Sequence, residues 1–230
     1  MRSIGRFVSL VALCCAFVVA APLTFVPLTG VVGGSPAATG VYKADLSTAG
    51  IGSILGLIIQ DNSAGLGGSP GQFSGFDLDA VKISTTNCAD AACAAAAPAL
   101  AVFDFVGGVF FTPGTQRVPV DPKLFGTGPA GNTVDNTVAT LALFDGNSTT
   151  AIPGAFGFIS MGDNGALFFN LTAPVTTTGA FLYIGEVGDN GEVAASSIRV
   201  TQDPAVPEPG SFILLGAGLA ALAIRRVKHS

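Results

Sequence analysis

The chain has 230 residues, of which 49% are hydrophobic and 11% charged, and its formal net charge at pH 7 is −5. Residues 38–205 hold fourteen acidic and five basic residues, a net charge of −9, because the other basic residues all lie near the two ends. A region this acidic repels nucleic acid and anionic lipid, so we expect no nucleic-acid partner.

The N-terminus has the pattern of a secretory signal peptide. Two arginines within the first six residues precede an uncharged, largely apolar run over residues 7–21. Small residues at Val18-Val19-Ala20 offer a cleavage site, and Ser35-Pro36-Ala37 offers a later one. We expect cleavage after Ala20, so that residues 1–20 are the signal peptide. The alternative is an uncleaved anchor, although a span needs about 20 apolar residues and this run is shorter.

Residues 38–203 carry short apolar or alternating runs separated by Gly, Asn, Asp, Ser and Pro, a pattern typical of many antiparallel strands. The candidate strands lie at residues 41–46, 53–59, 73–79, 81–84, 100–105, 109–112, 137–144, 155–161, 166–171, 179–186 and 197–201. We therefore predict an all-β domain, an antiparallel β-sandwich-like fold over residues 38–203.

Cys88 and Cys93 are the two cysteines that remain once the signal peptide, with Cys14 and Cys15, is removed. An even pair in an exported chain predicts a disulfide that closes a small loop. The alternative is a metal site, but the chain's one histidine is His229, and two thiolates alone rarely hold zinc. The alanine-rich residues 91–101 predict at most a short helix beside this disulfide, because Pro98 limits it.

Two similar segments, Gly162-Asp163-Asn164-Gly165 and Gly188-Asp189-Asn190-Gly191, follow apolar runs. Asn-Gly between such runs predicts a β-hairpin, since both residues tolerate the positive φ of a tight turn. The alternative is a calcium loop, because Asp and Asn oxygens bind calcium. Neither segment has the full EF-hand spacing with a glutamate at the twelfth position.

Asp77 and Asp79 alternate with Phe76 and Leu78, so on a strand the two carboxylates share one face. They form either the solvated face of a half-buried strand or a pair for cation binding or acid–base chemistry. Without histidine, residues 38–203 hold no Ser-His-Asp triad, Cys-His pair or His-ligated metal. A carboxylate-dependent glycosidase stays open on composition alone. We expect no enzyme and no cofactor.

The C-terminal tail has the pattern of a short membrane anchor. Residues 211–224 form a run of 14 without a charge, about 21 Å long as a helix, which is marginal for a core of about 30 Å. Arg225, Arg226 and Lys228 follow and act as stop-transfer residues on the cytoplasmic side. We predict a single transmembrane helix over residues 211–224.

Pro207-Glu208-Pro209, the Leu-Gly-Ala-rich apolar run after it and Arg225-Arg226 stand in the order of a known signal. This tail, residues 206–230, closely resembles the PEP-CTERM sorting signal. The resemblance implies export by a Gram-negative bacterium that makes exopolysaccharide, and processing by an exosortase, an integral membrane enzyme. It also implies that Pro207, Glu208 and Pro209 are the recognition residues.

We therefore expect a cell-surface or extracellular-matrix protein with a non-enzymatic structural or interaction role, associated with exopolysaccharide or biofilm. One alternative is a carbohydrate-binding module or adhesin, with calcium at the Asp/Asn-rich turns. The other is a glycosidase built on Asp77 and Asp79. Asn147-Ser148-Thr149 and Asn170-Leu171-Thr172 also match glycosylation sequons.

Overall fold

The computed structural model describes residues 22–34, 38–62, 69–147, 156–188 and 191–205. The strands are β1 (Val26–Val32), β2 (Thr39–Asp45), β3 (Ser53–Gln60), β4 (Asp77–Ser84), β5 (Val109–Thr112), β6 (Ile159–Ser160), β7 (Ala166–Thr176), β8 (Phe181–Val187) and β9 (Ser197–Thr201). The helices are the short α1 (Ala91–Ala96) and α2 (Glu192–Ala195). The predicted all-β class is confirmed, and α1 is the short helix predicted beside the cysteines.

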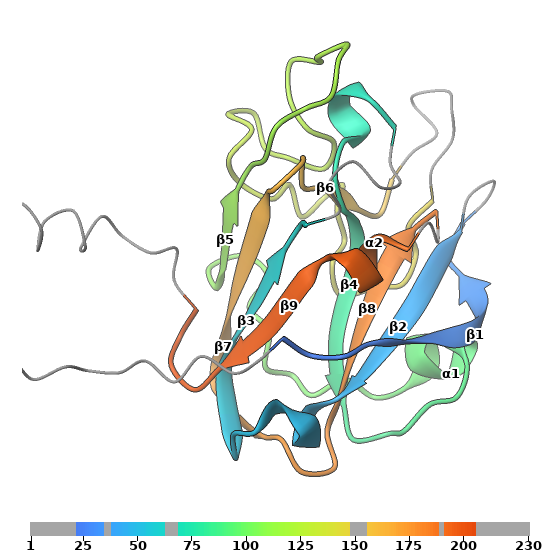
Figure 1. Ribbon diagram of the computed structural model, residues 1–230, viewed down its shortest axis with the longest axis vertical. Helices are drawn as coiled ribbons and strands as arrows, with labels where there is room; N and C mark the ends of the chain where they lie inside the picture. Colours follow the sequence, from blue (N-terminus) through green and yellow to red (C-terminus); the bar gives the residue numbers. More distant parts are fainter. Residues whose placement is uncertain (1–21, 35–37, 63–68, 148–155, 189–190, 206–230) are drawn as a thin grey trace, which may run out of the picture.

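The strands form two antiparallel sheets, one of five strands in the order β1-β2-β8-β4-β6 and one of four in the order β5-β7-β3-β9 (Figure 1). Both sheets contribute to one apolar core. Leu57 and Ile59 of β3 enter it from the four-stranded sheet, and Leu182 and Ile184 of β8 enter it from the five-stranded sheet. All four side chains are fully buried, so alternate residues of each strand hold the two sheets together.

The two sheets differ on their outer faces. The five-stranded sheet is covered, because every residue of β4 is buried and the alanines of α1 pack with Val41, Ala80 and Tyr183 in a second apolar cluster. In the four-stranded sheet, β3 alternates between buried and half-buried residues except at Gly56, which is buried like its neighbour Leu57. The outer face of this sheet is therefore partly open to solvent, except where other segments, such as Ala205 over Gly56, lie on it.

The structure corrects several strand boundaries. β1 lies before residue 38, so the β-rich region begins earlier than predicted. In place of the candidate strands at 73–79 and 81–84 there is the single strand β4, which begins only at Asp77, and in the described part of the candidate at 155–161 the strand is the two-residue β6. Residues 100–105 and 137–144 form no strand, and only Phe103 makes an isolated bridge, to Leu171. These two segments cover the sheets as loops.

Neither predicted hairpin is present, because the flanking strands belong to different sheets. β6 and β7 stand on either side of Gly162–Gly165, yet β6 pairs with β4 and β7 pairs with β3. β8 and β9 are likewise in separate sheets. Asn164 does adopt the positive φ expected of it, 66°, and its N–H donates to Asp61 Oδ2 at 2.8 Å. The tight turn therefore carries the chain from one sheet to the other.

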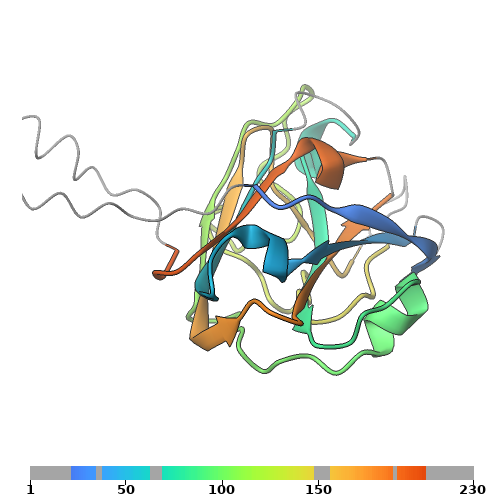
Figure 2. The ribbon, with the colours of Figure 1, turned by 60° about the horizontal axis from the view of Figure 1, so that its bottom comes forward.

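Both ends of the described domain lie on the same side, against the four-stranded sheet (Figures 1 and 2). The N–H of Leu23 donates to the carbonyl of Ile198 in β9 at 2.8 Å. At the other end Ala205 is buried, with 2% of its surface exposed. A Cβ added to Gly56 of β3 would lie 2.6 Å from the Ala205 nitrogen, so the chain end lies directly on that strand.

Among the residues described, no helix is long and apolar enough to cross a membrane. The predicted signal peptide, residues 1–20, and the predicted transmembrane helix, residues 211–224, both lie outside the described residues.

Candidate functional site

The predicted sorting residues Pro207, Glu208 and Pro209 lie outside the described residues, as do Arg225, Arg226 and Lys228. Their roles stay predictions. Within the described domain, side chains with notable chemistry gather in two places, the disulfide loop and a group of buried carboxyls.

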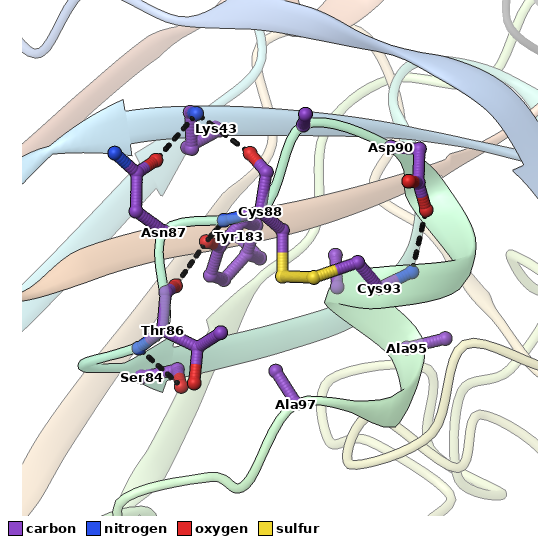
Figure 3. Close-up of a disulfide and its surroundings, with 12 residues drawn as sticks. Lys43, Ser84, Thr86, Asn87, Cys88, Asp90, Cys93, Ala95, Ala97 and Tyr183 are labelled. Carbon is purple, nitrogen blue, oxygen red and sulfur yellow. Dashed lines mark hydrogen bonds between the residues drawn. A yellow bond between two sulfur atoms is a disulfide. The ribbon is translucent and has the colours of Figure 1, made fainter.

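The disulfide joins Cys88, in the loop after β4, to Cys93 in α1, with an S–S distance of 2.05 Å (Figure 3). The Asp90 side chain caps the helix, because its Oδ1 accepts the Cys93 N–H at 2.7 Å. Asp90 therefore fixes the first turn of α1 in the position that brings the two sulfur atoms together.

The disulfide loop is also attached to the sheet beneath it (Figure 3). The Tyr183 hydroxyl of β8 accepts the Cys88 N–H at 2.9 Å and donates to the Thr86 carbonyl at 2.5 Å. Lys43 Nζ of β2 donates to Asn87 Oδ1 at 2.8 Å and to the Cys88 carbonyl at 2.7 Å. Cys88 is 1% exposed, so its sulfur serves the packing of this layer rather than chemistry in solvent.

Lys82 holds the other end of α1. Its Nζ donates to the carbonyls of Ala94, Ala95 and Ala97 at 2.9, 2.7 and 3.2 Å. The last carbonyls of a helix have no partner within it, so this buried ammonium supplies what the backbone cannot. Desolvation by burial lowers the pKa of Lys82. The Phe144 ring lies 5.1 Å from the same ammonium.

Asp77 and Asp79 do not lie on a solvated face of β4, so that interpretation of the sequence is wrong. Asp77 is 6% exposed and Asp79 is fully buried. Asp77 Oδ1 accepts the hydroxyl of Ser160, whereas Asp79 accepts Thr39 Oγ1 at 2.6 Å and the Gly146 N–H at 2.9 Å. Burial raises the pKa of Asp79 to about 7 and the pKa of Asp77 well above its usual range. The two carboxyls therefore join separate buried networks.

Asp77 belongs to a group of four buried carboxyls, which we call the acidic cluster: Asp61, Asp77, Glu186 and Glu192. Glu186 Oε1 accepts the Glu192 N–H at 3.1 Å, and Glu192 Oε2 accepts the Asp77 N–H at 3.3 Å. Glu192 Oε1 is buried without a hydrogen-bond partner. The cluster thus connects α2 to β4 and β8 through backbone groups.

Burial is the main cause of an unusual protonation state in the acidic cluster. Desolvation is the largest cause, and together with the charges of Asp77, Glu186 and Asp61 it raises the pKa of Glu192 to about 9. Glu192 is therefore neutral at pH 7. Arg117 forms an ion pair with Asp163, with Nη2 and Oδ1 2.6 Å apart, and its charge lowers the pKa of Asp77 slightly against the larger effect of burial.

The acidic cluster was missed by the sequence analysis, apart from Asp77. A signal was present, because Glu186 interrupts the apolar strand β8, where a charge is rarely buried without a partner. The described residues contain no group of three His, Cys, Asp or Glu side chains arranged to hold a metal ion. The turn at Asp163 and Asn164 is instead occupied by Arg117 and by the backbone contact to Asp61.

The two sequons differ in their placement. Asn147 is 2% exposed and its backbone pairs with Phe156, so the folded domain does not present this side chain to a modifying enzyme. Asn170 lies half-buried within β7.

The family model of the PEP-CTERM protein-sorting motif matches residues 205–227. The comparisons with curated proteins and with solved structures gave no match. The match begins at Ala205, the buried residue at which the described domain ends.

Proposed function

Because the chain carries the PEP-CTERM sorting motif, and is thus an exported protein that an exosortase sorts to the surface or the exterior, we propose that its β-domain has a non-enzymatic structural or interaction role there. We propose that it acts within exopolysaccharide or biofilm, after crossing the inner membrane of a Gram-negative bacterium. Residues 211–224 would hold the chain in that membrane until processing. The observation that carries the proposal is the sorting motif directly after a folded, acidic domain.

The organisation of the domain supports a structural role. The disulfide, the cap at Asp90 and the three bonds of Lys82 all fasten α1 to the five-stranded sheet. A disulfide is stable in the oxidising environment outside the cell, where such a protein must persist. A surplus of negative charge keeps it soluble among other macromolecules.

The alternatives receive less support from the described residues. Asp77 and Asp79 are buried and bonded within the fold, so they are not placed to reach a glycosidic bond. Tyr42 and Tyr183, the chain's two tyrosines, are 6% and 0% exposed and offer no platform for a sugar ring. We therefore retain the structural role as the proposal.

The experiment is processing and localisation in a host that has an exosortase, followed by mass spectrometry of the C-terminal peptide. We expect the wild-type chain to lose its tail near Pro207 and to reach the matrix fraction. Glu208→Ala should keep Lys228 and stay with the membrane. Asp104→Asn is the matched control, because it also removes one acidic charge, from an exposed loop of the domain. Equal retention of the tail by wild type and Glu208→Ala would overturn the sorting step.

The role in the matrix needs a separate measurement. Deletion of the whole protein should weaken the cohesion of the biofilm. Expression of the Cys88→Ser/Cys93→Ser variant in the deletion strain should restore this cohesion only in part. A purified chain that hydrolyses matrix polysaccharide would replace the structural proposal by an enzymatic one.

A further inference from the structure

We propose that the outer face of the four-stranded sheet is the surface on which the exosortase docks while it holds the sorting motif. This inference rests on the sorting step, not on the role in the matrix. It begins with the place at which the folded domain ends.

Very little chain separates the domain from the recognition residues. Ala205 is buried against Gly56, and Val206 alone stands between Ala205 and Pro207. Two residues of extended chain span at most about 7 Å. An enzyme that grips Pro207 to Pro209 is therefore in contact with the surface around β3 and β9, unless the end of the domain first unfolds.

That surface has the composition of an interface. The register of the strands places Phe110 beside Phe168, Phe168 beside Ile58, and Ile58 beside Arg199. These four residues form one row across the outer face, because the neighbouring residues Leu57, Ile59 and Phe169 point into the core. Phe110 is 42% exposed and the other three are half-buried. Aromatic side chains and arginine are enriched in protein interfaces.

The row lies close to the end of the domain. Gly56, against which Ala205 packs, is two positions before Ile58 on the same strand and face, a separation of about 7 Å. The Nε of Arg199 is buried and has no hydrogen-bond partner in the described part of the chain, so the described residues leave one donor of this side chain unused. Both the apolar area and the donor thus adjoin the place where the motif begins.

The charge of the domain favours a protein over the lipid surface as the occupant. Residues 38–205 carry a net charge of −9, which anionic lipid repels, and the four described strands of this sheet contribute the single cation Arg199 to its outer face. The outer face of the other sheet is already covered by α1 and its alanines over β2, β4 and β8, and only its edge strand β1 is largely exposed. The enzyme is also the one partner that must approach the chain at Pro207.

The test uses the full chain in a host with an exosortase and follows the rate at which the tail is lost. Inserting a flexible 12-residue Gly/Ser segment between Ala205 and Val206 moves the motif away from the row. We expect processing to become about tenfold slower, as for the loss of one good interface contact. Processing at the wild-type rate, or faster, would overturn the proposal, because the domain would then be a passenger or an obstacle.

Single variants locate the contact. Phe110→Ser should slow processing of the normal chain by a similar factor and should have no further effect in the chain with the spacer. Val118→Ser is the matched control, since Val118 is 82% exposed but lies in a loop outside the row. Equal effects of Phe110→Ser and Val118→Ser would contradict the docking surface. Circular dichroism on heating checks that each variant is folded.

Two further arms distinguish docking on the enzyme from lipid binding and from a failure of sorting. In a host without exosortase, a change in the membrane association of Phe110→Ser would show that the row binds lipid, and this would overturn the proposal. Glu208→Ala tests the sorting step itself. If Glu208→Ala is processed as fast as the wild type, the proposed sorting step is wrong, regardless of the result for Phe110→Ser.

Discussion

Replacing Glu192 by glutamine should make the protein more stable at alkaline pH and leave it nearly unchanged at acidic pH. Glutamine has the shape of a protonated glutamate, and its amide oxygen can still accept the Asp77 N–H, which lies 3.3 Å from Glu192 Oε2. Its NH₂ group would take the place of Oε1, which is buried without a partner among four carboxyls. The variant thus fixes the state that the buried glutamate adopts by holding a proton.

The size of the effect follows from the pKa of Glu192, which burial and nearby carboxylates raise from its usual 4.5 to about 9. The folded state binds this proton more tightly than the unfolded state. The contribution of this proton to the free energy of unfolding is therefore fully present below pH 4.5 and is lost as the pH rises toward 9. At 1.36 kcal/mol per pH unit the loss amounts to about 6 kcal/mol. This is an upper limit, because the short helix α2 can open and admit water. We expect about 2–4 kcal/mol at pH 9.

The assay is urea unfolding of the wild type and Glu192→Gln at pH 5, 7 and 9. The gap between their free energies of unfolding should widen with each step in pH. Asp104→Asn is the control, because Asp104 is exposed and hydrogen bonds from Gly107 and Val106 lower its pKa. It is therefore ionised throughout this range, and its effect should not change with pH. A constant gap for Glu192→Gln would refute the protonated cluster.

Three further predictions concern the layer on the five-stranded sheet and the N-terminus. Lys82→Met removes the donor to the carbonyls of Ala94 and Ala95 in α1 and of Ala97 just after it. It should lower the free energy of unfolding by about 2 kcal/mol, and an unchanged urea midpoint would show that water replaces the ammonium. Cys88→Ser/Cys93→Ser opens a loop with a sequence separation of 5 and should lower the free energy of unfolding by about 2 kcal/mol, as should reduction by dithiothreitol. A loss of all structure would contradict a local role of the disulfide. N-terminal sequencing of the secreted protein should give Ala21, because a start at Ala38 would remove β1 and the buried Leu23.

The sequence predicted the fold class because alternation and turn residues are local signals. β5 and β9 lie at the predicted residues, β2 and β8 differ by one or two positions at each end, and β3 differs by one position at its C-terminal end. The pairing was not predictable in the same way. Gly162–Gly165 has the local chemistry of a hairpin, yet β6 and β7 belong to different sheets, because the burial of both apolar faces decides which strands pair.

At the candidate site, too, local features could be predicted and long-range contacts could not. The disulfide could be predicted, since Cys88 and Cys93 are close in the chain and alone in the exported region. The acidic cluster brings Asp61, Asp77, Glu186 and Glu192 together from three strand ends and a helix. No local sequence pattern predicts such a long-range contact. For Asp77 and Asp79, alternation correctly indicated a strand. It could not show that loops and α2 bury the face on which the carboxylates lie.

The pairing of β3 with β9 has a consequence for the timing of folding during export. β3 is an inner strand of its sheet, and one of its two partners, β9, ends at Thr201, shortly before the sorting motif begins at residue 205. The sheet therefore cannot close until nearly the whole chain has emerged on the far side of the membrane. Until then β3 lacks one of its two partners, and β9 emerges shortly before residues 211–224, the predicted transmembrane segment. The predicted transmembrane segment therefore implies that the fold is completed at nearly the same time as the chain is arrested in the membrane.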